Sequence, residues 1–234
     1  MQPKLVTFDC ANTLIWTDWQ PHTFAVRCAG IAGLELPSDA AQRYMEIFLP
    51  KVPEFWLVNQ KRSFLLWREF WVQQVADWLK VLGIEDRDPL ELHLIGEREI
   101  FHSPSQTFRL FDDALWAVRE IKGMGIKVAV LSNWDHSLHQ CLEGHGLGEE
   151  FDAVFASLEY GVEKPDPKFF EVALNHFGVS PNECFHVGDD LVDDFEGAKT
   201  AGIPVALLER EQTQPAMPVI TTLRELSGAF EWYA

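Results

Sequence analysis

Short apolar runs that stop at polar residues mark the predicted strands of this chain. The first run, Leu5-Val6-Thr7-Phe8, is partly β-branched and stops at Asp9, which is typical of a buried strand leading into a loop. A helical stretch separates each run from the next, and this alternation predicts an α/β fold, a parallel sheet with helices on both faces. The later runs lie at residues 128–131, 153–155, 184–187 and 204–208.

Helical spacing of apolar residues and recognisable end signals locate the helices between these runs. Residues 112–123 form an amphipathic stretch that stops at glycines before the next strand. A second helix is expected to begin at Asp166-Pro167, as N-cap and first turn, and to end at Gly178. In the C-terminal segment we expect a last strand near Val219 and a helix at 222–231, which close the edge of the sheet.

Residues 15–105 interrupt the alternation. They hold six of the nine tryptophans and no run that predicts a strand. We therefore expect a helical-bundle cap domain over 15–105, with about four helices, inserted into an α/β core domain made of residues 1–14 and 106–234. Its aromatic stripe indicates core packing rather than a ligand platform. The stripe recurs at helical spacing through Phe64, Trp67, Trp71, Val75, Leu79 and Leu82.

Composition and charge exclude several classes of protein. The chain has 234 residues, enough for a large core plus a smaller domain, and no stretch approaches the roughly 20 apolar residues that span a bilayer. A start without an apolar signal region and four cysteines without CxxC spacing favour a cytoplasmic protein with reduced thiols. The net charge of −17 opposes binding to nucleic acid or anionic membranes. The oligomeric state stays open.

Polar residues follow the predicted strands at the edge where open α/β sheets bind ligands. Asp9 can serve as a nucleophile or as a ligand for a hard metal ion, or simply as a cap. Asn12 suits a loop position with positive φ, and Thr13 can donate a hydrogen bond to a phosphate. Ser132-Asn133, directly after the 128–131 strand, can hold phosphate oxygens or form a plain turn.

The richest of these segments follows the 184–187 strand. Residues 189–194 carry four carboxylates, which repel one another unless a cation compensates them. Oxygen ligands on Mg²⁺ explain this cluster, and a solvated acidic turn is the alternative. Lys164 can offset the carboxylates and bind phosphate as a point charge.

Taken together, these segments resemble the haloacid dehalogenase superfamily of aspartate-nucleophile hydrolases, over nearly the whole chain. The residues that carry the resemblance follow in the family's order, and the helical insertion directly after the first motif looks like that family's commonest cap. The resemblance implies a Rossmann-like parallel sheet core. The motifs are Asp9 with Thr13, Ser132-Asn133, Lys164-Pro165, Gly188-Asp189 with Asp193 and Asp194, and a similar ending at Gly197–Gly202.

The resemblance also implies roles for these residues in a Mg²⁺-dependent phosphatase of a small phosphorylated molecule. Asp9 would attack phosphorus and form an aspartyl-phosphate. Thr13, Ser132 and Asn133 would bind phosphoryl oxygens, and Lys164 would orient Asp9 and balance charge. The ligands of Mg²⁺ would be the carboxylates of Asp9 and Asp189 and the backbone carbonyl of Ala11, with Asp194 or Asp193 in the outer shell.

Ala11 departs from the family's phosphatases, which carry an acid–base aspartate two residues after the nucleophile. Acid–base help is typically worth 10²–10⁴ in rate, so alkyl phosphates should turn over poorly. Acyl, anhydride and aryl phosphates have less basic leaving groups and should lose less rate.

Four hypotheses follow: a phosphatase with another acid or an activated substrate, a non-catalytic binding protein, a carbon–phosphorus hydrolase or a dehalogenase. The third resembles phosphonoacetaldehyde hydrolases, with Lys51 or Lys61 as a Schiff base, although these usually have arginine where this chain has Lys164. Against the dehalogenase hypothesis, the dehalogenases of this family lack the acidic fourth motif that this chain carries at residues 189–194.

Three further residues near these motifs are interpreted as structural. His136 and His139 follow Ser132-Asn133 and are expected at surface helix positions. Cys10 is expected to be a small buried side chain beside Asp9.

Overall fold

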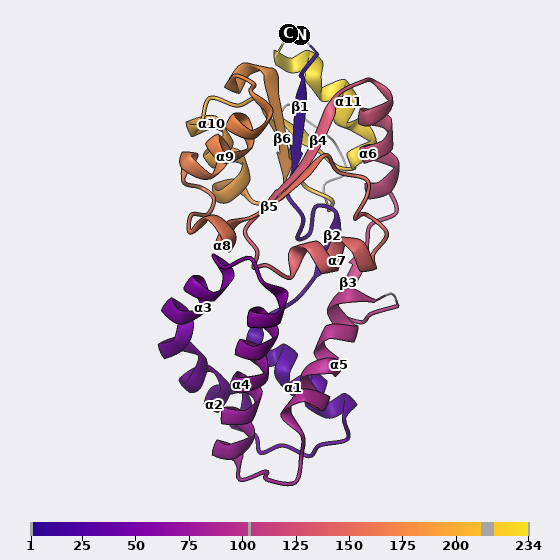
Figure 1. Ribbon diagram of the computed structural model, residues 1–234. Coiled ribbons are helices and arrows are strands. Elements are labelled where there is room, and N and C mark those ends of the chain that lie inside the picture. Colours follow the sequence, from indigo (N-terminus) through magenta and orange to yellow (C-terminus); the bar gives the residue numbers. More distant parts are fainter. Residues whose placement is uncertain (1, 103, 212–217, 234) are drawn as a thin grey trace. The chain divides into compact units, whose positions relative to one another are not determined.

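The computed structural model describes residues 2–102, 104–211 and 218–233, which form two compact units (Figure 1). Unit 1 comprises Met1–Trp16 and Leu110–Ala234, and unit 2 comprises Thr17–Arg109.

Unit 1 is built on a six-stranded parallel sheet with the order β5-β4-β1-β6-β7-β8. All four residues of β1 are buried, as expected for a central strand covered on both faces. The predicted α/β fold with a parallel sheet is confirmed. The strands are β1 (Leu5–Phe8), β4 (Lys127–Ser132), β5 (Ala153–Ala156), β6 (Cys184–Gly188), β7 (Val205–Leu208) and β8 (Val219–Ile220).

The register of the sheet brings the ends of its central strands together. Phe8, the last residue of β1, pairs with Val130 on β4 and with Val187 on β6. The loops that leave these three strands therefore start at the same edge of the sheet, and the predicted site residues occupy these loops.

Helices cover both faces of this sheet, with α9 and α10 on one face and α6 and α11 on the other (Figure 1). The predicted helix at 112–123 is α6, which begins at Ala114. The helices and helical turns of unit 1 are α6 (Ala114–Gly123), α7 (Leu138–Gly144), α8 (Ser157–Tyr160), α9 (Pro167–Phe177), the 3₁₀ turn Pro181–Glu183, the π turn Leu191–Glu196, α10 (Gly197–Thr200), the 3₁₀ turn Leu223–Glu225, α11 (Leu226–Ala229) and the 3₁₀ turn Phe230–Tyr233.

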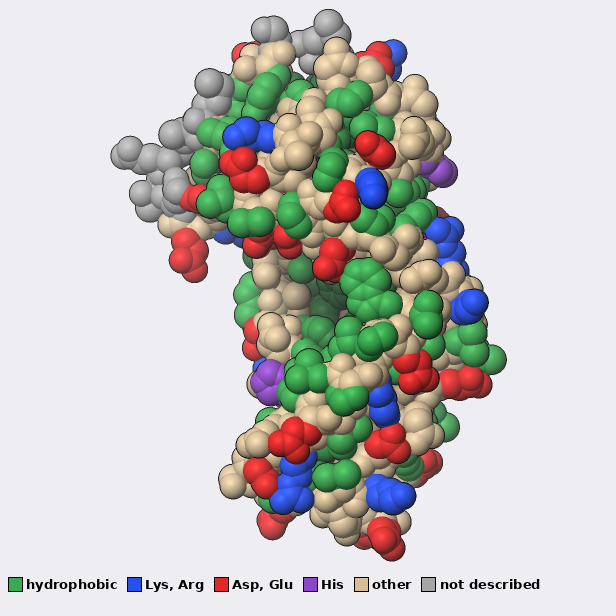
Figure 2. All heavy atoms as spheres, turned by 90° about the vertical axis from the view of Figure 1, so that its left-hand side faces the viewer, with side chains coloured by type: hydrophobic (Ala, Val, Ile, Leu, Met, Phe, Trp, Pro, Cys, Tyr) green, Lys and Arg blue, Asp and Glu red, His purple; other side chains and the backbone are tan. Residues whose placement is uncertain are grey.

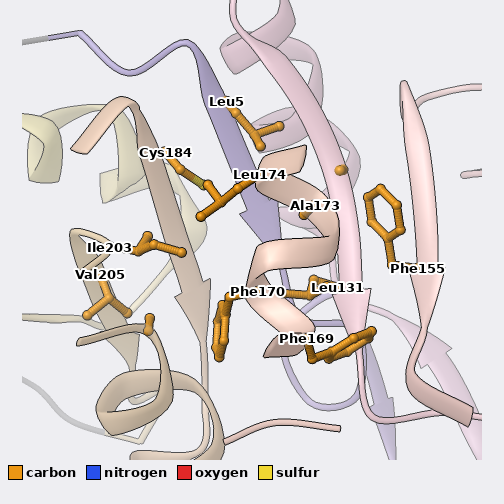
Figure 3. Close-up of a cluster of buried hydrophobic side chains, with 12 residues drawn as sticks. Leu5, Leu131, Phe155, Phe169, Phe170, Ala173, Leu174, Cys184, Ile203 and Val205 are labelled. Carbon is orange, nitrogen blue, oxygen red and sulfur yellow. The ribbon is translucent and has the colours of Figure 1, made fainter. Parts of the chain in front are cut away.

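Helix α9 has the end signals that its sequence predicts. The Asp166 carboxylate accepts a hydrogen bond from the backbone N–H of Lys168, Pro167 occupies the first turn, and Gly178 ends the helix in the left-handed conformation. Its apolar face packs on one face of the sheet, where Phe169 and Phe170 lie beside side chains from the strands (Figure 3). The prediction for this helix is confirmed at both ends.

The C-terminal segment is less helical than predicted. The expected strand near Val219 is β8, at the edge of the sheet. The expected helix at 222–231 is wrong in its length, because only Leu226–Ala229 is α-helical, between two 3₁₀ turns. The glycine at 228, a poor helix former, lies in the middle of this segment.

Unit 2 contains five α-helices among its described residues, where about four were expected. The extra helix arises because residues 40–59, a stretch without glycine, break into two helices at a 3₁₀ turn. Pro53 lies in the first turn of the second of these helices, where its missing N–H costs nothing. The helical elements are α1 (Pro21–Ile31), α2 (Ala40–Phe48), the 3₁₀ turn Leu49–Lys51, α3 (Val52–Asn59), α4 (Phe64–Leu82) and α5 (Pro89–Phe101).

The aromatic stripe of helix α4 is core, as predicted. Trp67, Trp71 and Trp78 are all buried, and the Trp78 indole N–H donates to the carbonyl of Ala40 at 2.8 Å. Ser63 caps the start of the helix by accepting from the N–H of Leu66. Burial of large aromatic side chains is the main source of stability available to so small a unit.

Two short strands were not predicted. β2 (Ile15–Thr17) and β3 (Phe108–Leu110) form a separate two-stranded sheet. The expectation that residues 15–105 contain no strand is therefore wrong at residues 15–17. A three-residue strand has too few positions to show an alternating pattern, so its sequence carries little signal.

The surface mixes the two signs of charge with apolar side chains. On the face drawn in Figure 2, Lys and Arg (blue) are interspersed with Asp and Glu (red) and with hydrophobic groups (green). Over the part of the chain that is described, none of the helices has the length and apolarity needed to cross a membrane.

Candidate active site

Asp9 is the first residue after β1 and is buried, with 5% of its surface exposed. Its Oδ1 accepts a hydrogen bond from Ser132 Oγ at 2.9 Å and another from Lys164 Nζ at 2.6 Å. Burial raises the pKa of the Asp9 carboxyl, and the charge of Lys164 opposes that rise. Within the described residues, both of these side-chain contacts fall on Oδ1, so Oδ2 remains for a ligand.

The loop that follows Asp9 is held by its backbone. Asn12 has φ of 56°, which confirms the predicted left-handed position. Thr13 Oγ1 donates to Asp189 Oδ1 at 3.2 Å, so this hydroxyl joins the first loop to the acidic segment. Cys10 is fully buried, as expected. Ala11, the position that departs from the phosphatase pattern, lies in this loop and forms an isolated bridge with Ile15.

Arg210, which is distant in sequence, binds the backbone of this loop. Its Nη2 donates to the carbonyl of Thr13 at 2.6 Å, and its guanidinium pairs with Asp113 at 2.9 and 3.1 Å. The guanidinium also stacks on the ring of Phe111, 3.7 Å from the centroid. Burial alone would raise the pKa of Asp113, but hydrogen bonds from Arg210 and Thr222 hold it below its usual range.

Lys164 is the central cation of the site. It is 3% exposed, and its Nζ lies 2.6 Å from Asp9 Oδ1 and 2.5 Å from Asp194 Oδ1. Burial would lower the pKa of Lys164, but the charges of Asp194 and Asp9 outweigh burial and raise it. The ammonium is therefore fixed in its charged form between two buried carboxylates.

The amide of Asn133 fixes the backbone at Lys164. The N–H of Lys164 donates to Asn133 Oδ1 at 2.8 Å, and Asn133 Nδ2 donates to the carbonyl of Lys164 at 2.9 Å. Asn133 Nδ2 also contacts Asp193 Oδ2 at 3.1 Å. In this arrangement both ends of the amide hold protein groups, and the predicted phosphate contact of Asn133 stays a prediction.

Asp194 lies under the site and makes several polar contacts. Its Oδ1 accepts from Lys164 and lies 3.1 Å from His186 Nε2, and its Oδ2 accepts from the N–H of Asp190 at 3.0 Å. Burial would raise the pKa of Asp194, but Lys164 and His186 outweigh it and lower the pKa. The position of Gly188 leaves room for this carboxylate, because an added Cβ there would lie 2.1 Å from Asp194 Cγ.

The donor set fits a hard divalent cation. Single carboxylate oxygens of Asp9, Asp189 and Asp194 lie within 4.8 Å of one another. Burial and the charges of Asp9 and Asp194 raise the pKa of Asp189 to about 7. When Asp189 is ionised, the three carboxylates and the Lys164 ammonium carry −3 and +1, a net charge of −2 that one divalent ion balances. All-oxygen ligands of this kind suit Mg²⁺.

The structure thus brings together Asp9, Thr13, Ser132, Lys164 and Asp189, as the sequence analysis expects of residues that follow adjacent strands. Of the two alternatives for the outer shell, Asp194 points into this cluster, and the contact recorded for Asp193 is with Asn133. The carbonyl of Ala11 as a metal ligand stays a prediction.

The two lysines considered for a Schiff base lie in unit 2. Of the lysines considered for a Schiff base, Lys51 pairs with Asp77 at 2.5 Å, and Lys61 is exposed. Sequence reasoning missed His186, which is fully buried between Thr7 and Asp194, and Arg210. No local pattern shows that His186 contacts Asp194. A signal for its importance does exist, because His186 is a polar residue inside the otherwise apolar strand β6.

The expectation of surface helix positions is confirmed for His139, which lies on α7 with 36% of its side chain exposed, and is wrong for His136, which precedes that helix. Both side chains also have a partner that was not expected. Their ring nitrogens contact one oxygen of the buried Glu159, at 2.6 and 2.7 Å. The sequence gives no hint of this pairing, because Glu159 lies 20 residues from the nearer histidine.

Comparisons with known proteins agree with this architecture. A family model described as haloacid dehalogenase-like hydrolase matches residues 3–202. Haloacid dehalogenase-like hydrolase domain-containing protein 3 of Bos taurus is 31% identical over 213 residues, which cover 87% of this chain and 80% of that protein. Glyceraldehyde 3-phosphate phosphatase of Methanopyrus kandleri is 35% identical over 220 residues, with coverage of 92% and 88%.

A solved structure supports the same fold. The 2-haloacid dehalogenase from Pseudomonas syringae pv. Tomato DC3000 superposes with a TM-score of 0.66 at 23% sequence identity, and the match covers 100% of both chains. At this identity the likeness shows the fold and carries no information on the reaction.

Proposed function

This chain belongs to the haloacid dehalogenase-like hydrolase family, and from that premise we propose that it is a Mg²⁺-dependent phosphatase that uses Asp9 as its nucleophile. The observation that carries the proposal is the pair of hydrogen bonds to Asp9 Oδ1, from Lys164 at 2.6 Å and from Ser132 at 2.9 Å. A buried carboxylate that is fixed by one oxygen presents the other oxygen in a defined direction, as nucleophilic attack requires.

The proposed reaction has two displacements at phosphorus. Asp9 Oδ2 attacks phosphorus, the bond to the leaving oxygen breaks, and that oxygen departs and takes a proton from water. A second water then attacks the aspartyl-phosphate, the bond between phosphorus and Asp9 breaks, and orthophosphate leaves. Lys164 opposes protonation of the free Asp9 carboxylate in the first step, and in both steps Lys164 and Ser132 together hold Oδ1, the oxygen that does not attack.

Asp189 and Asp194, together with Asp9, are the side chains that would hold Mg²⁺. When bound, the ion would supply positive charge beside the phosphoryl oxygens. Thr13, whose hydroxyl contacts Asp189, is placed to turn toward a phosphoryl oxygen once the Asp189 carboxylate is engaged. His186 keeps Asp194 in place from below the sheet edge.

Ala11 shapes the substrate class. A methyl side chain can neither protonate the leaving oxygen nor activate water, and such help is worth about 10²–10⁴ in rate. The substrate should therefore carry a leaving group that needs no protonation, as in acyl, anhydride or aryl phosphates. The similarity to a protein named glyceraldehyde 3-phosphate phosphatase supports a small phosphorylated molecule as the substrate but not the activated leaving group, because the compound in that name is an alkyl phosphate. We further propose that residues 15–105 act as the cap that selects it.

The test is turnover of acetyl phosphate and of p-nitrophenyl phosphate by the purified protein, with Mg²⁺ and with EDTA. Wild type should hydrolyse both in Mg²⁺, and Asp9→Asn should remove the activity because an amide is not a nucleophile here. Ala11→Asp should extend the activity to alkyl phosphates by about 10²-fold or more. The proposal is abandoned if wild type is silent on both substrates or if Asp9→Asn is as active as wild type.

Two controls separate the other hypotheses. Release of halide from a 2-haloacid in EDTA would indicate a dehalogenase, and borohydride trapping with a phosphonoaldehyde would indicate a Schiff-base lysine. The carboxylate cluster of Asp9, Asp189 and Asp194 favours the phosphatase over the dehalogenase, because attack on carbon needs no cation to balance three carboxylates.

A further inference from the structure

A second group of potential metal ligands lies in unit 1, apart from the carboxylates around Asp9. His136 Nδ1 and His139 Nε2 both contact Glu159 Oε1, at 2.6 and 2.7 Å, and their rings lie 5.4 Å apart between centroids. One ligand atom from each residue lies within 4.8 Å of the other two. The three side chains therefore converge on one point from two segments of the chain.

The chemistry of this group differs from that of the first. Two imidazole nitrogens with one carboxylate oxygen suit zinc-like transition ions, whereas Mg²⁺ prefers oxygen ligands alone. The glutamate is buried, and both histidines reach the same oxygen of it, Oε1. A carboxyl group with 4% of its side chain exposed needs polar partners or a cation beside it, and the two imidazoles are where an ion would join them.

From these contacts we infer that His136, His139 and Glu159 form a binding site for a divalent transition-metal ion of the zinc type. Three protein ligands of this kind are the usual set for zinc sites that keep a further position for water or a substrate group. The ion can enter from solvent past His139, whose side chain is 36% exposed.

The ligand spacing is close to what such an ion needs. In a tetrahedral site with bonds of about 2.0–2.1 Å, ligand atoms lie about 3.3 Å apart. The two nitrogen–oxygen contacts are 2.6 and 2.7 Å, so each would lengthen by roughly 0.6 Å as the ion replaces the hydrogen bonds. Side-chain adjustments of this size do not require a change in the backbone, and His139, whose side chain is the most exposed of the three, has the most room to move.

Such an ion would brace the loops that carry the first site. His136 lies three residues after Asn133, and Glu159 lies in α8, five residues before Lys164. Asn133 and Lys164 are themselves joined by two hydrogen bonds through the backbone of Lys164. The zinc-type ion would thus connect the same two segments at a second point. The inference does not depend on the proposed phosphatase activity.

The test measures binding rather than turnover. Wild type, His139→Gln, Asp189→Asn and the double variant are titrated with Co²⁺, as a coloured substitute for Zn²⁺, by visible absorption and equilibrium dialysis. Wild type should bind an ion that His139→Gln loses and Asp189→Asn retains, and its spectrum should show visible bands without a thiolate charge-transfer band. The affinity of that ion should fall by more than about 100-fold in His139→Gln, since even outer-shell partners of a metal are worth 10–100-fold.

Two further variants control for nonspecific binding by histidine and for loss of folding. His102→Gln removes an exposed histidine outside the cluster and should bind like wild type. Glu159→Gln should also lose the ion, and circular dichroism shows which variants remain folded. His139 is partly exposed, so its variant provides the result even if Glu159→Gln fails to fold. The inference is overturned if folded His139→Gln binds Co²⁺ as wild type does, or if Asp189→Asn alone removes all binding.

Discussion

Replacement of Lys164 by methionine tests most directly whether the lysine charge stabilises the buried carboxylates of Asp9 and Asp194. Methionine keeps the approximate length of the side chain and removes its charge. The variant leaves Asp9 and Asp194 buried, with carboxylate oxygens within 4.8 Å of each other and without the ammonium that contacts both. The change therefore isolates the charge of Lys164 from the space that it fills.

The expected loss follows from that geometry. Two unit charges 4.8 Å apart repel by about 3–4 kcal/mol at an effective dielectric constant of about 20. Removing one partner of a buried ion pair typically costs about 3–5 kcal/mol, for the same reason. We expect Lys164→Met to lower the free energy of unfolding by about 3–5 kcal/mol near neutral pH, and His186, 3.1 Å from Asp194, to keep the loss from being larger.

The pH dependence gives a second check on the same cause. In the variant, burial and repulsion raise the folded-state pKa of at least one of the two carboxyls above its unfolded value of about 4. A group with a raised pKa takes up a proton on folding, so the variant regains stability as the pH falls toward that pKa. The difference from wild type should therefore be smaller near pH 5 than near pH 7.5.

Urea denaturation followed by far-ultraviolet circular dichroism measures both quantities. Fluorescence is less suitable, because five of the nine tryptophans lie in unit 2, outside the affected core. Lys127→Met is the matched control: this lysine pairs with Asp152 at 2.7 Å but is 62% exposed, so its loss should cost less than about 1 kcal/mol. A loss below about 1 kcal/mol for Lys164→Met, or an equal loss at both pH values, would refute the reasoning.

Two other substitutions test the surroundings of the site. Gly188→Ala places a Cβ 2.1 Å from Asp194 Cγ and should cost at least about 1–3 kcal/mol in thermal unfolding. Gly123→Ala, in α6 with nothing within 4 Å of the new Cβ, should be neutral or stabilising by up to about 1 kcal/mol, and equal effects of the two would contradict the packing argument. Asp113 has a lowered folded-state pKa beside Arg210, so its contribution to stability is present above the ordinary carboxyl range and is lost as the pH falls through the folded pKa. Asp113→Asn should therefore flatten the acid side of a plot of stability against pH, and an unchanged acid side would argue against this ion pair as its cause.

Much of the site could be predicted because its residues follow directly from the apolar runs. Asp9, Ser132 and Asp189 come at or just after the ends of β1, β4 and β6, and parallel register brings those ends to one edge. The end signals of α9 were equally local, since the Asp166 cap and Gly178 act within a few residues of the helix. Local chemistry and strand order were sufficient for these features.

The unpredicted features depend on contacts between distant segments. Arg210 binds backbone carbonyls of the first loop, and a carbonyl is the same in every residue, so no side-chain pattern marks its partner. His136, His139 and Glu159 meet only once α8 packs beside the loop after β4. Two other misses are local: the break between α2 and α3 falls at Pro50 and Pro53, a helix-breaking signal that the sequence does carry, and the three-residue β2 is too short to show a pattern.

The central position of β1 has a consequence for how the protein is made. Synthesis runs from the N-terminus, so this strand leaves the ribosome more than 115 residues before β4 and about 180 residues before β6, the two strands that pair with it. Residues 17–109, which form a unit with a core of their own, are complete before either partner exists. The nascent chain therefore carries an apolar strand with two open edges until β4 emerges, and with one open edge until β6 emerges, and in that interval it depends on chaperones or on speed to avoid pairing with the wrong strand.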